Sequence, residues 1–268
     1  MRFGFCTEFA SAFKDKADYE LLERISKASF DFVEFRLKLL AELTEEEFAL
    51  LSARLRNIGL AADVSCALFP GSIRLTGPDA DNRKTRDYLK HAFARAAALG
   101  SSKLVFGSAP ARELPDGVTW DEGYRQLTHM IKEVMLPLCG QYDINVVIEP
   151  IRSNACNFIH TLKDGMKLVE MVDSPRIGLL ADSLHMLTNK DDPEDVTRYL
   201  NYITHVHISN SSRALPEDEY EPEVLAVLEN LKSGKYDNTI SFESNAGTVE
   251  DSMTKALGKL RRWFCDRA

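Results

Sequence analysis

Short apolar runs alternate with amphipathic segments along the whole chain, and this alternation restricts the fold more than any other feature of the sequence. The apolar runs have the length of strands, and they carry too little polar alternation for a half-exposed sheet. Both properties are typical of parallel strands that are buried on two faces. Eight runs have this character: residues 2–6, 32–35, 60–65, 103–106, 145–148, 177–181, 203–208 and 239–242.

The segments between these runs have helical spacing of apolar residues. Thr44 and Glu47 form a capping box at the start of one helix, and Gly100 is placed to end another. Pro137 predicts a break within the longest segment. The predicted helices span residues 18–28, 44–57, 83–99, 120–141, 162–172, 193–200, 224–231 and 249–264.

Eight strands alternating with eight helices predict an α/β protein, a single (β/α)8 TIM barrel that forms one domain over residues 1–268. No linker, low-complexity segment or change of composition divides the chain. A doubly wound open sheet is the alternative architecture. A closed ring is favoured because it gathers polar strand ends better than an open sheet does.

Composition excludes several classes of function. The net charge of -8 disfavours nucleic-acid binding, which depends on basic residues. No apolar run is long enough to cross a membrane. The five cysteines are odd in number and lack a C-x-x-C pair, which indicates reduced thiols, and Cys6 and Cys66 are expected to be buried and inert. Because Met1 leads directly into a strand-like run, without a signal peptide, we expect a cytoplasmic protein.

Four neighbouring strands are followed by a strong ligand at their carboxyl ends: Glu149, Asp182, His207 and Glu243. In a parallel barrel these ends share one face, where active sites are built. Three carboxylates gathered there would repel one another unless a cation binds between them. Three oxygens and one nitrogen suit Mn²⁺, Mg²⁺ or Co²⁺ better than the usual nitrogen and sulfur sites of Zn²⁺.

Other interpretations of the same residues stay open at this point. An acid at a strand end is often a helix N-cap, and Asp182 alone fits that role equally well. His205 shares a strand face with His207 and is expected one layer deeper, outside the ligand set. His185 lies just past its strand and is expected to contact substrate. Arg213 is either a substrate-binding cation or a solvated loop residue.

At these residues the chain resembles the xylose-isomerase-like barrel superfamily, and within it the ketose 3-epimerase branch. The resemblance covers nearly the whole chain. It implies a single divalent ion, typically Mn²⁺, with Mg²⁺, Co²⁺ or Zn²⁺ as alternatives. It also implies Glu149 and Glu243 as the acid/base pair and His185 and Arg213 as substrate contacts. The motifs that carry it are Glu149 in VVIEP, Asp182 and His185 in ADSLHM, His207 in HVHIS with Arg213 six residues on, and Glu243 in SFES.

The segment after Glu149 departs from the family pattern. Arg152 stands where Asn is common, Ser153 where Arg is common, and Ala155 where a substrate-binding Glu is common. A standard ketohexose substrate is therefore in doubt. Arg112 and the loop at residues 70–82 are expected either to bind a phosphate or to cap the barrel.

The function predicted from these features is a sugar isomerase or epimerase that acts on a ketose or ketose phosphate through an enediolate. Hydroxypyruvate isomerase or inosose dehydratase chemistry on the same scaffold is an alternative. So is a sugar-binding barrel with altered catalysis. A DNA-repair endonuclease is disfavoured, because the strands at 60–65 and 103–106 offer no histidine for a larger metal cluster. We expect a small-molecule sugar partner, no nucleic acid and no membrane, and a homo-oligomer stays open.

Overall fold

A closed ring of eight parallel strands forms the centre of the molecule. The computed structural model describes residues 1–7, 16–217, 219–244 and 250–265. The strands follow one another around the ring in chain order, and β1 pairs with both β2 and β8, which closes the barrel. The predicted (β/α)8 architecture is therefore confirmed. The strands are β1 (Arg2–Cys6), β2 (Phe32–Arg36), β3 (Ala61–Cys66), β4 (Lys103–Phe106), β5 (Asn145–Ile148), β6 (Ile177–Asp182), β7 (Ile203–Ile208) and β8 (Thr239–Glu243).

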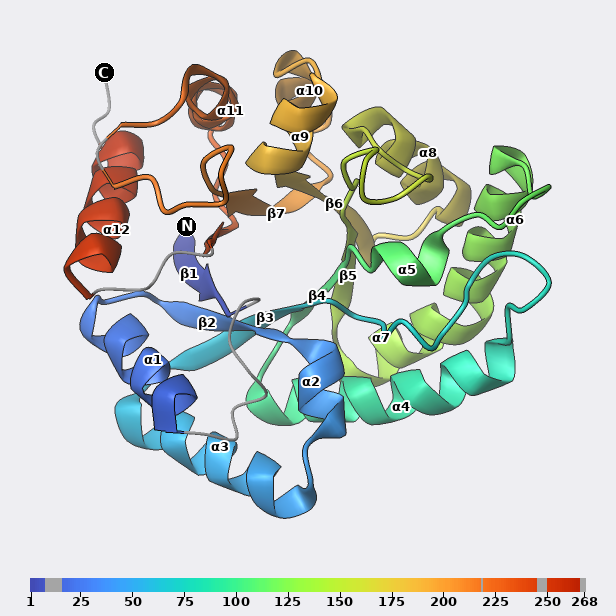
Figure 1. The fold of residues 1–268 in the computed structure, drawn as a ribbon, viewed down its shortest axis with the longest axis horizontal. Helices are drawn as coiled ribbons and strands as arrows, with labels where there is room; N and C mark the ends of the chain where they lie inside the picture. Colours follow the sequence, from blue (N-terminus) through green and yellow to red (C-terminus); the bar gives the residue numbers. More distant parts are fainter. Residues whose placement is uncertain (8–15, 218, 245–249, 266–268) are drawn as a thin grey trace.

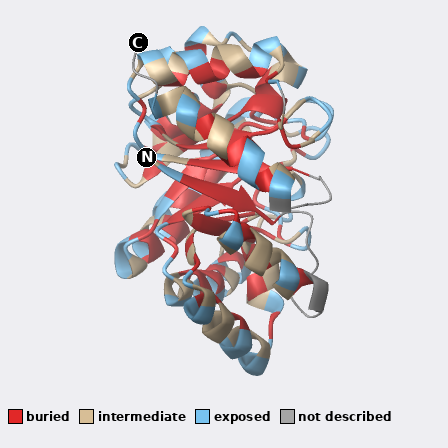
Figure 2. Cartoon of the chain, turned by 90° about the vertical axis from the view of Figure 1, so that its left-hand side faces the viewer, coloured by how far each residue is buried: buried red, intermediate tan, exposed pale blue. Residues whose placement is uncertain are grey.

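Helices surround the ring, with α1–α4 on one side of the barrel and α8–α12 on the opposite side (Figure 1). The outer faces of these helices are exposed and the strands between them are buried (Figure 2). The helices are α1 (Lys16–Lys27), α2 (Leu37–Glu42), α3 (Glu45–Ile58), α4 (Asn82–Leu99), α5 (Ala109–Arg112), α6 (Trp120–Met130), the π-helical η1 (Ile131–Met135), α7 (Leu136–Tyr142), α8 (Leu162–Val172), α9 (Ser183–Asn189), α10 (Glu194–Arg198), α11 (Pro222–Ser233) and α12 (Glu250–Cys265).

Local signals in the sequence set several helix ends. The Thr44 side chain accepts a hydrogen bond from the Glu47 backbone N–H, and the Glu47 carboxylate accepts from the Thr44 N–H, so the predicted capping box is present. Gly100 ends α4 with a φ of 87°, which glycine adopts without strain.

The helical segments differ from the prediction in two respects. The long segment at 120–141 is interrupted by a π turn at η1, and Pro137 lies in the first turn of α7, where its missing N–H costs nothing. The short helices α2, α5 and α9 were not predicted as separate elements. Each follows directly or closely after the carboxyl end of a strand. The first residue of the predicted helix 249–264 lies outside the described residues.

The interior of the barrel is apolar in the middle and closed by a cation at one end. Inward side chains form a small apolar cluster: Cys6, Phe32, Val64, Cys66, Val105, Val147 and Leu180. At the amino end of β4, Lys103 donates hydrogen bonds to the Thr204 carbonyl, the Asn238 amide oxygen and the Thr239 hydroxyl. Burial lowers the pKa of Lys103 to about 8. This end of the barrel is thus filled, and a binding site belongs at the other end.

None of the helices in the described part of the chain is long and apolar enough to cross a membrane. The cysteines are free thiols, and Cys6 and Cys66 are buried as expected.

Candidate metal centre and its pocket

The four side chains at the ends of β5–β8 converge at the carboxyl end of the barrel. Glu149 directly follows β5, Asp182 ends β6, His207 lies near the end of β7, and Glu243 ends β8. Asp182 and His207 are direct neighbours in the strand register. One ligand atom from each residue lies within 4.8 Å of the corresponding atoms of the other three, and all four side chains are buried. The structure therefore brings together the complete set predicted as metal ligands.

The geometry of this cluster fits a bound cation. His207 Nδ1 lies 3.3 Å from Glu243 Oε2, 3.4 Å from Glu149 Oε1 and 3.8 Å from Asp182 Oδ2. His207 Nδ1 is buried without a hydrogen-bond partner among the described residues, although three carboxylates surround it. Buried polar atoms are normally paired, so this nitrogen indicates a missing partner. Three carboxylates and one imidazole suit a divalent ion of the Mn²⁺ or Mg²⁺ kind.

Asp182 caps a helix with one carboxylate oxygen and faces the cluster with the other. Its Oδ1 accepts hydrogen bonds from the backbone N–H groups of Leu184 at 2.7 Å and His185 at 3.0 Å, which caps α9. Its Oδ2 faces the cluster. Burial alone would raise the pKa of Asp182, but His185, Arg213 and His207 together hold that pKa well below its usual range.

Glu34 approaches the cluster from β2, and no role was predicted for it from the sequence. This buried acid lies on β2, two residues after the inward-facing Phe32. Its carboxylate is 3.0 Å from His207 Nε2 through one oxygen and 3.0 Å from His205 Nε2 through the other. His205 is thus in a layer below the cluster, as expected. An inward acid within the apolar run FVEF was the available signal, since such an acid requires a partner inside the barrel.

Charge in this lower layer sets the tautomer of the histidines. Burial would raise the pKa of Glu34, but His207 and His205 lower it well below its usual range, so Glu34 is ionised. Burial lowers the pKa of His205 to about 4 despite Glu34. An ionised Glu34 accepts N–H from Nε2 of both rings. Burial alone would lower the pKa of His207, but Glu34 and Glu243 hold that pKa well above its usual value. A divalent ion bound at the cluster would take the place of the Nδ1 proton of His207.

His185 and Arg213 border the cluster. His185 Nε2 lies 3.8 Å from both Glu149 Oε1 and Asp182 Oδ2, and its Nδ1 has no hydrogen-bond partner among the described residues. Arg213 Nη1 donates to Asp182 Oδ2 at 2.9 Å and pairs with Glu243 Oε2. Arg213 is therefore part of the site, and the alternative of a solvated loop arginine is excluded.

A pocket of about 250 Å³ opens above the cluster. Its lining includes Glu149, His185 and Glu243 together with Cys66 and Gly107. A Cβ atom at Gly107 would lie 1.7 Å from Glu149 Oε2, so only glycine leaves room for this carboxylate.

Arg112 caps the barrel, which decides between its two predicted roles. Its side chain is fully buried and donates to the carbonyl oxygens of Phe106 at 3.1 Å, Glu149 at 2.7 Å and Ile159 at 3.4 Å. Because the guanidinium donates its hydrogen bonds to backbone oxygens, phosphate binding by Arg112 is not supported.

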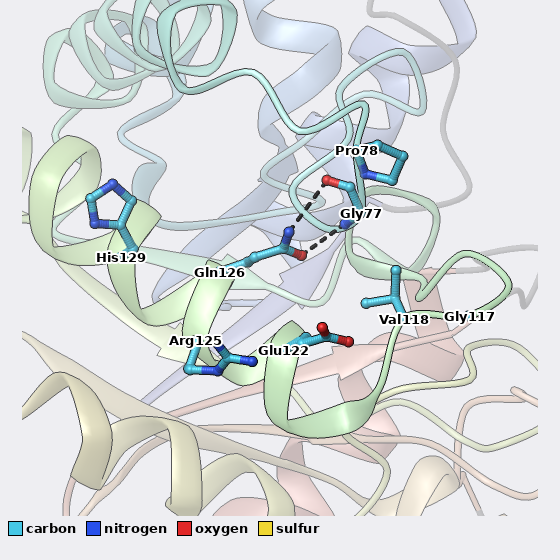
Figure 3. A pocket seen from close by; sticks show the side chains of 8 residues that line it. All are labelled: Gly77, Pro78, Gly117, Val118, Glu122, Arg125, Gln126 and His129. Atoms are coloured by element: carbon cyan, nitrogen blue, oxygen red, sulfur yellow. Dashed lines mark hydrogen bonds between the residues drawn. The ribbon is translucent and has the colours of Figure 1, made fainter.

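The loop at residues 70–82 is fixed against its neighbours. The Leu75 N–H donates to the Ala111 carbonyl at 2.8 Å. The Gly77 N–H donates to Gln126 Oε1, and Gln126 Nε2 donates to the Gly77 carbonyl (Figure 3). The pocket drawn in Figure 3, about 430 Å³ in volume, contains none of the cluster residues in its lining.

The residues that depart from the family pattern lie at the rim. Arg152 and Ala155 line the pocket above the cluster. Ser153 is exposed, and its backbone N–H donates to Asn189 Oδ1 at 2.9 Å. The segment that departs from the family pattern therefore borders the pocket above the cluster.

Comparisons with known proteins agree with this architecture. The chain matches the model of the xylose isomerase-like TIM barrel family over residues 22–266. A probable ketose 3-epimerase from Synechocystis sp. is 24% identical over 161 residues, which cover 56% of this chain and 53% of the relative. The chain thus spans about half the length of this curated relative.

Solved structures share the fold over nearly the full length. A D-allulose 3-epimerase from Methylomonas sp. has a TM-score of 0.85 at 20% identity and covers 98% of both chains. A D-psicose 3-epimerase from Clostridium cellulolyticum H10, solved with D-tagatose, has a TM-score of 0.84 at 17% identity and covers 98% of this chain and 99% of its own. Because the family model matches most of the sequence and the barrel is complete, the chain belongs to the xylose isomerase-like TIM barrel family.

Proposed function

We propose that this protein is a divalent-metal-dependent epimerase or isomerase of ketoses, and that Mn²⁺ is its preferred ion. The observation that carries the proposal is the pair of buried glutamates, Glu149 and Glu243, within 4.8 Å of each other and of Asp182 and His207. The epimerase relatives and neighbours support the substrate class. The free thiols fit a reducing compartment, so we place the enzyme in the cytoplasm.

Glu149, Asp182, His207 and Glu243 would hold the ion. When bound, a divalent ion supplies a Lewis acid that stabilises the negative charge of an enediolate derived from the substrate. The protein itself supplies the proton transfers. Glu149 follows β5 and Glu243 ends β8, and in this mechanism the two act on opposite faces of an α-carbon. One carboxylate removes the proton and the other returns one from the opposite face, which inverts the centre.

His185 and Arg213 would assist this proton transfer. His185 Nε2 lies close enough to Glu149 for both to contact the same substrate, and its second nitrogen has no partner among the described residues that would compete. Arg213 holds positive charge beside Asp182 and Glu243. Both groups are placed to stabilise negative charge on substrate oxygens. Arg112 positions Glu149 through its hydrogen bond to the Glu149 carbonyl.

Deuterium exchange tests the proposal. Candidate ketoses and their C3 epimers are incubated with the Mn²⁺-loaded protein in D₂O, and exchange at the inverting carbon is followed by NMR. Two bases on opposite faces predict that Glu149→Gln abolishes exchange from one epimer, and that Glu243→Gln abolishes it from the other. Metal content is measured in parallel, because both residues are also ligands. Glu229→Gln, an exposed substitution on α11, is the control.

Equal exchange of both epimers by both variants, at full metal content, would exclude the two-base mechanism. Deuterium at a neighbouring carbon, with formation of an aldose, would identify an aldose–ketose isomerase instead. Absence of turnover on every sugar, with metal bound, would indicate the sugar-binding barrel.

A further inference from the structure

Besides Arg213, two further cations line the pocket above the cluster. Lys38 lies on α2, directly after β2, and Arg152 lies in the loop after β5, three residues beyond Glu149. Neither belongs to the cluster of Glu149, Asp182, His207 and Glu243. They belong to different parts of the chain, and the pocket brings them to the same space as Glu149 and Glu243.

Arg152 carries an unsatisfied donor. Its Nε atom is buried and has no hydrogen-bond partner among the residues that the structure describes. A buried N–H without a partner costs free energy, and an acceptor brought by a ligand would remove that cost. Ala155, which also lines the pocket, adds only a methyl group to the lining.

The charges of the pocket favour an anion once the metal centre is loaded. The acidic residues in its lining are Glu149 and Glu243, and both belong to the metal centre together with Asp182. A divalent ion and Arg213 offset these three carboxylates. Lys38 and Arg152 then add positive charge to the same space. Apart from His185 and the charged residues already named, the residues that line the pocket are uncharged.

We propose that the pocket binds a substrate with an anionic group, a phosphate ester or a carboxylate, at the end away from its reacting carbon, and that Arg152 with Lys38 recognises this group. The inference rests on the proposed function and narrows its substrate class. Arginine binds planar or tetrahedral oxyanions through two N–H groups at once, which gives Arg152 the larger share of the recognition.

Binding of inert polyols tests the inference without catalysis, because a polyol has no carbonyl group and cannot form an enediolate. Dissociation constants of sorbitol, sorbitol 6-phosphate and gluconate are measured by calorimetry with the Mn²⁺-loaded and the metal-free protein. We expect the phosphate, the carboxylate or both to bind at least 10-fold more tightly than sorbitol. The two anionic arms distinguish a phosphate ester from a carboxylate as the natural group.

Variants assign the effect to Arg152. Arg152→Ala is expected to weaken binding of the anionic polyol by about 10- to 100-fold, the value of a charge-assisted contact, and to weaken sorbitol far less. Arg152→Lys keeps the charge and should lose only part of the affinity, and Lys38→Met should weaken the anion by a smaller factor. Arg56→Ala removes an exposed cation from α3 and serves as the control, and thermal melting verifies folding of each variant.

The outcomes separate this inference from the proposed function. An equal effect of Arg152→Ala on sorbitol and its phosphate, or tight gluconate binding that depends only on Mn²⁺, would overturn the anion site while deuterium exchange still stands. Absence of deuterium exchange from every ketose, with anion affinity still dependent on Arg152, would reject the epimerase and keep the anion site.

Discussion

The two halves of the barrel rim have opposite chemistry. The ends of β5–β8 carry Glu149, Asp182, His207 and Glu243, whereas the ends of β1 and β3 carry the thiols Cys6 and Cys66. The loop after β4 adds a glycine to that second wall. One half can therefore bind an ion, and the other half gives the pocket its shape. Glu34 is the exception, because it reaches from β2 to His207.

The thiol wall is electrically neutral. Cys6 Sγ lies 3.5 Å from Cys66 Sγ. Burial first, and then Cys66, Glu34 and Glu243, raise the pKa of Cys6 well above its usual value, so the thiol stays protonated. Cys6 therefore adds no negative charge to the cluster. The comparison suggests that removing a charged group should abolish ion binding, while removing a thiol should not.

The largest expected effect is loss of the ion in the charged half. His207→Ala removes the nitrogen ligand and should lower Mn²⁺ affinity by more than about 100-fold, since it also leaves Glu34 without one of its donors. Cys66→Ala, on the opposite wall, should leave Mn²⁺ affinity within about twofold. Calorimetric titration of metal-free protein measures both. Equal losses in the two variants would contradict the division of the rim.

Glu34→Gln should weaken Mn²⁺ binding by about 10- to 100-fold, which is the usual effect of removing a partner of a ligating histidine. The amide cannot accept N–H from both His205 and His207, so one ring must change its tautomer or lose its hydrogen bond. Calorimetry measures the affinity, and the exposed Glu46→Gln on α3 is the control. An unchanged affinity would show that Glu34 acts on folding alone.

Gly107→Ala should lower turnover by roughly 10-fold, because the new methyl group would displace the Glu149 carboxylate, which is one of the two bases in the proposed mechanism. Gly71→Ala is a matched control, since Gly71 lines the same pocket and its Cβ would lie 4.0 Å from the nearest neighbour. Steady-state kinetics on the best ketose compares the two. Similar turnover in both variants would mean that the half of the rim that gives the pocket its shape tolerates an added methyl group.

The smallest effect concerns a carboxylate in the charged half that no cation compensates. Both oxygens of Asp191 are buried without a hydrogen-bond partner among the described residues, and burial, followed by Asp195 and Asp164, raises its pKa to about 7. A carboxyl group in the unfolded chain has a pKa of about 3.9, so the folded state loses stability as pH rises between these values.

Asp191→Asn should therefore stabilise the protein by about 1 kcal/mol at pH 8, a value reduced for partial exposure, and by less at pH 5. Thermal melting at both pH values measures the difference. Asp116→Asn, an exposed substitution, should change neither. A stabilisation that does not depend on pH would exclude titration of Asp191 as its cause.

The sequence predicted the charged half more completely than the neutral half. Each cluster residue is the first strong polar group after an apolar strand, so chain order and strand direction were enough to group the four. Glu34 was given no role because its partners lie 171 and 173 residues away, and an acid within the apolar run FVEF indicates the need for a partner without identifying it. The choice between the two predicted roles of Arg112 stayed open because its acceptors are backbone carbonyls, which the identity of the side chains does not reveal.

The short helices were not predicted for a different reason. Helices α2, α5 and α9 contain four to seven residues, too few for a helical period of apolar residues to show. The predicted break at Pro137 came from a correct rule for helix interiors. The rule does not apply here, because the π turn η1 precedes Pro137 and the proline lies in the first turn of the next helix, α7.

The bonds of Arg112 have a consequence for the segment that carries Arg152. This side chain joins the end of β4, the Glu149 backbone and the Ile159 carbonyl. The chain between Glu149 and Ile159 can consequently exchange residues such as Arg152 while both of its ends stay anchored. Substitutions there can thus change the lining of the pocket without moving the Glu149 carboxylate.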